Sequence, residues 1–192
     1  MLRRATLEDA DALSALASTC FTQTFGHLYA PDDLDHFMHE AYSPEVLRAE
    51  LADPKRPTWL LSEELSMDTE SAPSPAHVDE GSEGKLIGYV TACPAHLPHP
   101  DVKPTDGEVQ RLYLLQEYQG GGRGSRMLEH ALNWLEADGP RTLWIGAWSE
   151  NYGAQRLYGR YGFTKVGEYS FMVGDHADRE FILRRDAAVQ EF

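Results

Sequence analysis

EVQRLYLLQEYQGGGRGSRMLEHALNWL, residues 108–135, decides the fold of this 192-residue chain. Its first part, Glu108–Leu115, is typical of a β-strand, and Gln119–Gly124 is a glycine-rich turn. The residues beyond the turn keep one apolar helix face, made of Met127, Leu128, Ala131, Leu132 and Leu135. A strand, a glycine-rich turn and a helix can together hold phosphate, because the first helical amides lack intrahelical partners and lie at the positive end of the helix dipole.

Taken alone, the turn has two interpretations. One is a pyrophosphate cradle, in which glycines let the backbone approach the ligand and Arg123 and Arg126 supply positive charge. The other is a tight structural connection between strand and helix. Two common phosphate motifs are excluded: no GxxxxGK[ST] P-loop is present, and the dinucleotide fingerprint GxGxxG does not fit at Gly120 or Gly122.

The rest of the chain predicts a mixed α/β sheet within one domain, residues 1–192. Helices are expected after the capping box Thr6–Asp9, over Pro31–Glu40, from Ser43 to Ala52 and over Tyr152–Tyr161. Further strands are expected at Met1–Ala5, Thr58–Leu61, Lys85–Thr91, Arg141–Trp148, Val166–Val173 and Arg179–Leu183. Residues 64–84 form a polar insertion in a hairpin, either a regulatory or lid segment or a plain surface loop.

Composition narrows the function. The chain has 31 acidic and 17 basic residues and a net charge of −14, whereas a nucleic-acid-binding protein needs an excess of basic residues to neutralise phosphates. The acidic surface has two interpretations: it keeps the protein soluble, or it attracts cationic substrates. Cys20 and Cys93 are too few for a disulfide framework. With no signal-peptide pattern at the N-terminus and no run of about 18 apolar residues, we expect a cytoplasmic protein without a membrane partner.

Three stretches together resemble the GNAT N-acetyltransferase superfamily. They are Gln119-x-x-Gly122-x-Gly124 after the strand, Asn151-x-x-Ala154-x-x-x-Tyr158-x-x-x-Gly162-Phe163, and the opening Arg-Arg-Ala-Thr-x-x-Asp-Ala. The resemblance implies a GNAT acyl-CoA N-acyltransferase fold. Its central sheet is mixed, mostly antiparallel and twisted, has about seven strands, is flanked by about four helices, and is splayed between the fourth and fifth strands.

The resemblance also implies acetyl-CoA as the co-substrate. It assigns the cofactor site to Leu112, Tyr113, Leu114, Gln119, Gly120, Gly121, Gly122, Arg123, Gly124, Ser125, Asn151 and Ala154. The backbone of Leu112 and Leu114 would pair with the pantetheine amides, and Asn151 would hold the same arm. Tyr158 matches the tyrosine that protonates the departing thiolate, a suitable donor for a thiol with a pKa of about 8.5.

The base is less directly indicated. Many members of the family carry a glutamate at the position of Gln110, which has no basic group. Glu108 lies two residues earlier on the same strand face and is the expected base, acting through water. A solvated carboxylate at the start of a strand is the alternative.

The acceptor site is expected around His27, Tyr29, Gln110 and Trp148. Several stretches, among them Thr24–Tyr29 and Tyr169–Gly174, resemble the polyamine (spermine/spermidine) acetyltransferase-like branch. No metal is predicted: His36 and His39 do not form HExxH, and they are interpreted as solvated helix residues. Neither cysteine has an evident base for a covalent acyl-carrier role.

The sequence therefore predicts direct transfer of acetyl from acetyl-CoA to a primary amine of a small molecule, with polyamine-like amines favoured. A protein or peptide N-acetyltransferase and a non-catalytic acyl-CoA sensor are the alternatives. The resemblance allows a homodimer.

Overall fold

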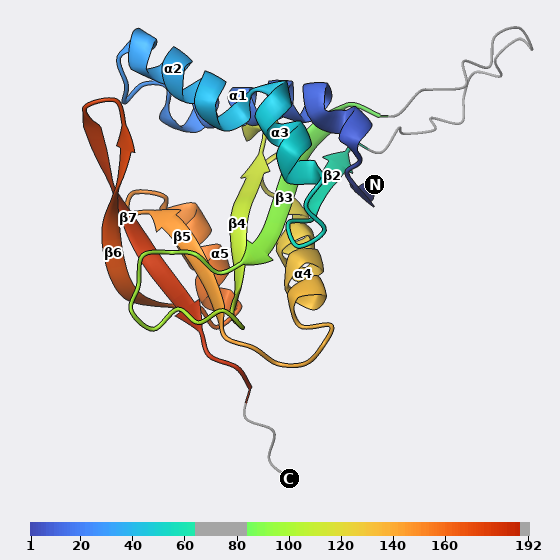
Figure 1. The fold of residues 1–192 in the computed structure, drawn as a ribbon, viewed down its shortest axis with the longest axis vertical. Coiled ribbons are helices and arrows are strands. Elements are labelled where there is room, and N and C mark those ends of the chain that lie inside the picture. The colour runs from blue at the N-terminus through green and yellow to red at the C-terminus, as the bar shows by residue number, and fades with distance from the viewer. Residues whose placement is uncertain (64–83, 189–192) are drawn as a thin grey trace, which may run out of the picture.

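The computed structural model describes residues 1–63 and 84–188, in which seven strands form one sheet of order β1-β2-β3-β4-β5-β7-β6 (Figure 1). The strands are β1 (Leu2–Arg4), β2 (Thr58–Ser62), β3 (Leu86–Pro94), β4 (Gly107–Leu114), β5 (Leu143–Trp148), β6 (Thr164–Val173) and β7 (His176–Arg185). Neighbouring strands are antiparallel except for the parallel pair β4 and β5. The predicted mixed, mostly antiparallel sheet is confirmed.

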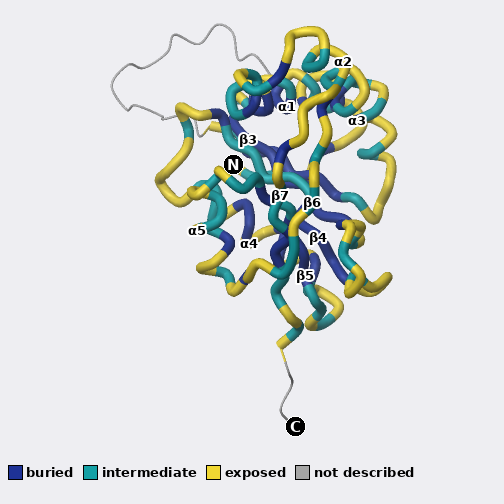
Figure 2. Tube along the Cα trace, turned by 90° about the vertical axis from the view of Figure 1, so that its left-hand side faces the viewer, coloured by how far each residue is buried: buried dark blue, intermediate teal, exposed yellow. Residues whose placement is uncertain are grey.

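Helices cover both faces of this sheet. They are α1 (Ala10–Phe25), α2 (Pro31–Tyr42), α3 (Pro44–Leu51), α4 (Arg123–Leu135) and α5 (Tyr152–Arg160), five in the described residues where about four were predicted. The first three share one apolar core with the sheet, and α4 and α5 share the other. Figure 2 shows the buried stretches of β3, β4 and β5 between these layers.

The sheet splays where β4 leaves β5. The two strands pair only at Gly107 with Leu143 and at Glu108 with Trp144, and beyond these residues they diverge. From Val109 to Leu114, β4 is therefore paired with β3 alone and offers its other edge to the gap. The predicted splay between the fourth and fifth strands is confirmed.

A β-bulge lies beside the gap. Thr91 of β3 pairs with Arg111 and Ala92 pairs with Val109, so Gln110 has no partner on β3. Such a bulge turns the side chain of the extra residue away from the regular alternation of the strand.

Apart from Gly84, the predicted insertion at 64–84 lies outside the described residues. In the described part of the chain, none of the helices has the length and apolar character needed to cross a bilayer.

Candidate active site

One cavity, of about 350 Å³, lies between the end of β4, the glycine-rich turn and α5; we call it the cofactor cleft. Its lining brings together most of the predicted cofactor residues: Leu112, Tyr113, Leu114, Gln119, Gly120, Gly122, Gly124, Ser125, Asn151 and Ala154. Tyr158 also lines it.

Backbone conformation explains the glycines of the turn. Gly120, Gly121 and Gly122 have φ angles of 83°, 59° and 77°, a left-handed conformation that costs other residues about 1–2 kcal/mol. Gly122 is the N-cap of α4. Three successive left-handed residues bend the chain sharply enough to aim the start of α4 at the cleft.

The same turn presents unpaired amides. Within residues 1–63 and 84–188, the backbone N–H groups of Gly120, Gly121 and Gly122 donate no hydrogen bond to protein. The same holds for Gly124 and Ser125 in the first turn of α4. Unpaired amides at the positive end of a helix dipole are the groups that bind phosphate oxygens.

The arginines lie differently from the prediction. The Nη1 of Arg123 lies 3.4 Å from the carbonyl of Tyr118, and its side chain lines a separate cavity together with Gly121 and Arg126. Arg160, the last residue of α5, lines the cofactor cleft. No local motif points to Arg160, because α4 and α5 meet only in the folded protein.

Asn151 caps the start of α5, the helix that carries Tyr158. Its Oδ1 accepts a hydrogen bond of 3.0 Å from the Ala154 amide, which is an N-cap interaction. The cap leaves the Nδ2 donors without a protein partner in the described residues, available to a carbonyl of the pantetheine arm. Tyr158 is seven residues further along the same helix and is 6% exposed.

A second cavity, of about 310 Å³, occupies the splay between β4 and β5; we call it the transfer cleft. It shares Tyr158 and Asn151 with the cofactor cleft, and Gln110, Trp148 and Glu180 also line it. Within the described residues, the edge of β4 facing it has no strand partner beyond Glu108, so an extended pantetheine arm can pair there as an added strand would.

A third cavity, of about 280 Å³, lies beyond the transfer cleft; we call it the acceptor cavity. Eight aromatic side chains line it: Phe21, Phe25, Tyr29, Phe37, Tyr42, Tyr113, Tyr169 and Phe171. Glu108, Asp178 and Glu180 add three carboxyl groups, while the guanidinium of Arg111 is paired with Glu50.

A family model describes this arrangement. The acetyltransferase (GNAT) family model matches residues 34–163, which is more than half of the chain. The chain belongs to this family. It is an N-acetyltransferase that uses acetyl-CoA.

Relatives agree with this assignment. An uncharacterized N-acetyltransferase of Lactobacillus delbrueckii subsp. lactis is 24% identical over 178 residues, which is 93% of this chain and 92% of the relative. The spermine/spermidine N(1)-acetyltransferase of Bacillus subtilis is 33% identical over 92 residues, covering 46% and 59% of the two chains. The solved structure of PaiA N-acetyltransferase from Thermoplasma acidophilum with coenzyme A has a similar fold, with a TM-score of 0.68, 19% identity and coverage of 97% and 98%.

The acetyltransferase brings only part of the predicted acceptor site together. Tyr29 and Gln110 line the acceptor cavity, and Trp148 lines the transfer cleft, with its ring 5.4 Å from that of Phe25. His27 does not reach these cavities: it is exposed in the turn after α1, and that turn carries Tyr29 inward instead. His36 and His39 are exposed on α2.

Two acidic residues of β7 were missed from the sequence. Asp178 is 5% exposed, accepts a hydrogen bond from the Tyr29 hydroxyl and lies 3.2 Å from His176 Nε2. Glu180 lies two residues further along the same strand and lines both the acceptor cavity and the transfer cleft. Their period-two spacing was the available signal, but the predicted strand began at Arg179 and so divided the pair.

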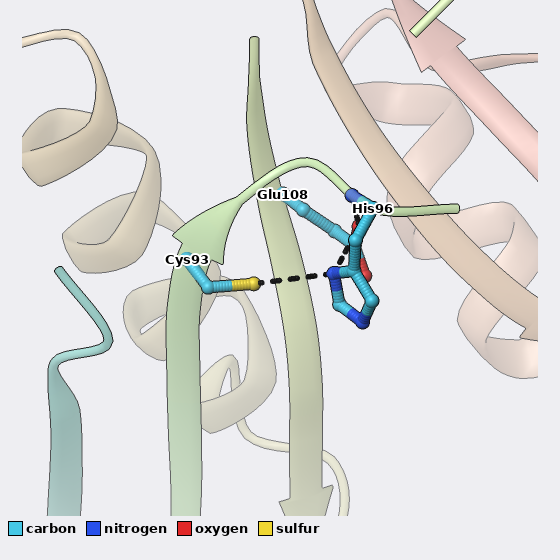
Figure 3. Close-up of side chains that lie close together, drawn as sticks. All are labelled: Cys93, His96 and Glu108. Carbon is cyan, nitrogen blue, oxygen red and sulfur yellow. Dashed lines mark hydrogen bonds and ion pairs between the residues drawn. The ribbon is translucent and has the colours of Figure 1, made fainter. Parts of the chain in front are cut away.

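Glu108 is buried and bound to the loop that follows β3. Its Oε2 accepts the His96 amide at 2.9 Å and lies 3.1 Å from His96 Nδ1, and this contact raises the pKa of the imidazole (Figure 3). Cys93 Sγ lies 3.7 Å from the same nitrogen. These three groups have ligand atoms within 4.8 Å of one another and could hold a metal ion, a set that the sequence did not indicate because two elements supply it.

The thiols are poor nucleophiles. Burial is the main cause that raises the pKa of both Cys20 and Cys93 to about 12, so each stays protonated at neutral pH. A buried, protonated thiol is poorly suited to carry the acyl group as a covalent intermediate.

Proposed function

We propose that this acetyltransferase acetylates a primary amine of a small cationic molecule, with polyamine-like amines favoured. One observation carries the proposal: an aromatic-lined cavity with three carboxyl groups opens onto the splay where the thioester would lie. The partial match to a spermine/spermidine acetyltransferase supports the same acceptor class.

Charge and shape both suit an alkylammonium. The guanidinium of Arg111 is neutralised by Glu50, so Glu108 and Asp178, and Glu180 once it ionises, leave the cavity with an excess of negative charge. Ring faces attract ammonium groups and also pack against methylene chains, and a polyamine offers both. An anionic or neutral acceptor would leave carboxylates uncompensated in a partly buried site.

The proposed chemistry follows from the sheet. The pantetheine arm pairs with the free edge of β4 near Leu112 and Leu114, which brings the thioester carbonyl into the transfer cleft. The neutral amine attacks the carbonyl carbon, and a β4 amide stabilises the oxyanion, an interaction worth about 3–4 kcal/mol when well placed. The tetrahedral intermediate then collapses, the C–S bond breaks, and Tyr158 protonates the sulfur.

The environment of Tyr158 suits a group that must hold its proton until the sulfur leaves. Burial, and then the charge of Glu180, raise the pKa of Tyr158 well above its usual value. The hydroxyl is therefore protonated throughout the neutral range. Its proton can pass to the sulfur as the C–S bond breaks, because the proton that the amine nitrogen loses at the same stage replaces it.

Thiol release from acetyl-CoA tests the proposal with a panel of polyamines, monoamines, amino sugars and N-terminal peptides. We expect the highest kcat/KM with polyamines, and a fall in kcat/KM as salt screens the cavity. Preference for peptides would support the protein acetyltransferase. Tight CoA binding without turnover of any acceptor would support the sensor.

A further inference from the structure

The acceptor cavity and the transfer cleft share one carboxyl group. Both are lined by the same five residues, Phe25, Gln110, Tyr113, Gly146 and Glu180. We call this set the junction, because an amine attacking the thioester must pass through it. Among the five, Glu180 alone has a group that can be ionised as a base at neutral pH, since burial raises the pKa of Tyr113 well above its usual value.

We propose that Glu180 is the general base that takes the proton from the acceptor amine, and that the Gln110 side chain orients the same nitrogen. This inference rests on the acetyl transfer proposed above. The general base then lies on β7, at the end of the splay. The competing candidate for the base is Glu108 of β4.

The register of the sheet places Glu180 at the point of transfer. Its Cα pairs with Trp148, the last residue of β5, on one side and with Tyr169 of β6 on the other. Gly146 of β5 leaves room beside it: a Cβ there would lie 3.2 Å from the Tyr169 hydroxyl. The absence of that Cβ keeps the junction open between the two cavities.

Hydrogen bonding separates Glu180 from the other two carboxylates of the acceptor cavity. The Glu108 carboxylate accepts the His96 amide and contacts the His96 ring. The Asp178 carboxylate accepts the Tyr29 hydroxyl and contacts the His176 ring. The Glu180 carboxylate accepts no hydrogen bond from any described residue, so its lone pairs are available to a ligand.

Gln110 adds a second acceptor at the same place. The bulge in β4 directs it into the junction, and its buried Oε1 has no hydrogen-bond partner in the described part of the chain. A buried acceptor without a donor is costly. Two free acceptors facing one junction call for a ligand with several N–H groups, and a primary ammonium has three.

The electrostatics of the junction suit this role. Burial, and then the charge of Asp178, raise the pKa of Glu180 to about 8. A bound ammonium would lower that pKa again and so ionise the carboxylate when the proton must be taken. The charge of Glu180 in turn contributes to the raised pKa of four tyrosines: Tyr29, Tyr113, Tyr158 and Tyr169. Glu108, His96 and Arg111 are further charged or titratable groups that line the acceptor cavity.

The protons balance in this scheme. An alkylammonium loses one proton to Glu180 before attack, and its nitrogen loses a second as the amide forms. Tyr158 gives one proton to the sulfur and regains one, and the other leaves to solvent from Glu180. Once Glu180 is protonated, its charge no longer raises the pKa of Tyr158, so the acid strengthens as the thiolate departs.

Glu180→Gln tests the assignment, because it keeps the shape of the side chain and removes the base. We expect kcat/KM for the best polyamine to fall about 100- to 10,000-fold, with unchanged CoA affinity by calorimetry. The pH dependence of kcat/KM should lose the rise that comes from ionisation of the carboxylate and keep the rise that comes from deprotonation of the amine. An acceptor whose amine pKa is lowered by fluorine substitution should show a smaller defect.

Glu168→Gln is the matched control, since Glu168 lies in the same hairpin but is bound by Lys165 and Arg179 outside the three cavities. It should retain wild-type kinetics. If Glu180→Gln stays within about threefold of wild type while Glu108→Gln loses the rise that comes from the carboxylate, the base is Glu108 and this inference fails alone. A wild-type protein that binds CoA but acetylates no amine overturns the proposed function and this inference together.

Discussion

The cofactor cleft and the acceptor cavity are built by different means. The cofactor cleft is lined by two short segments, the end of β4 with its turn and the region from Asn151 to the end of α5. The acceptor cavity uses side chains from α1, α2, β4, β6, β7 and the loops between elements, with Gly146 as the residue of β5. The family model ends at Phe163, before the β6–β7 hairpin that carries Tyr169, Asp178 and Glu180. Donor recognition is thus local and shared with the family, whereas acceptor recognition depends on side chains from distant segments.

The largest expected effect is on kcat, from removal of the Tyr158 hydroxyl, which lies where the cofactor cleft meets the transfer cleft. Tyr158→Phe keeps the ring packed against Phe163 but leaves the thiolate without a proton donor. We expect kcat to fall about 100- to 10,000-fold with CoA affinity nearly unchanged. Steady-state thiol release and CoA calorimetry measure both quantities, and an unchanged kcat would remove Tyr158 as the acid.

A change confined to the acceptor cavity should leave the donor site intact. Asp178→Asn keeps an acceptor for the Tyr29 hydroxyl but removes one negative charge. We expect KM for a polyamine to rise about 10-fold, because the cavity attracts the ammonium groups with one negative charge fewer, without loss of CoA affinity. Removing that charge also lowers the pKa of Glu180, so the ascending limb of the pH profile should move to lower pH. A limb that does not move would contradict this coupling.

A change confined to the glycine-rich turn should lower CoA affinity without affecting the choice of acceptor. Gly122→Ala places a Cβ on a residue with φ of 77°, at a strain of about 1–2 kcal/mol. We expect CoA affinity to fall about tenfold, with no change in the relative kcat/KM of different amines. Gly139→Ala is the matched control, because Gly139 also has a positive φ, 118°, but lies outside the three cavities. Equal loss of CoA affinity in both variants would show that general strain, and not the cradle, is responsible.

The smallest effect concerns stability alone. The pKa of Glu180 is raised on folding to about 8, so the folded state holds a proton that the unfolded state releases near pH 4.5. The stability of the wild type should fall as pH rises from about 5 to above 8, while that of Glu180→Gln should not show this component. We expect the difference between the two to change by about 1–2 kcal/mol between pH 6 and 8.5, after allowance for partial exposure. Urea unfolding of both proteins at both pH values measures this difference. If the free energy of unfolding changes with pH by the same amount in both proteins, the pKa of Glu180 is not raised.

The sequence by itself determined the fold and most of the donor site. Its signals are local: a strand, glycines at positions that need positive φ, an amphipathic helix and an asparagine cap ahead of Tyr158. Each depends on residues within a few positions of one another, so backbone geometry follows from the order of amino acids. Arg160 could not be predicted in this way, because it reaches the cofactor cleft only through the packing of α5.

Only the tertiary structure decided the acceptor side. The register of β7 between β5 and β6 carries Glu180 to the junction, and the bulge in β4 brings Gln110 to face it. His27, two residues before Tyr29 in sequence, is exposed in the turn after α1. In sequence Glu180 is one of 31 acidic residues. Its distinction depends on Gln110 and Trp148, which lie more than 30 residues away, and no local pattern encodes which side chains will meet across a splayed sheet.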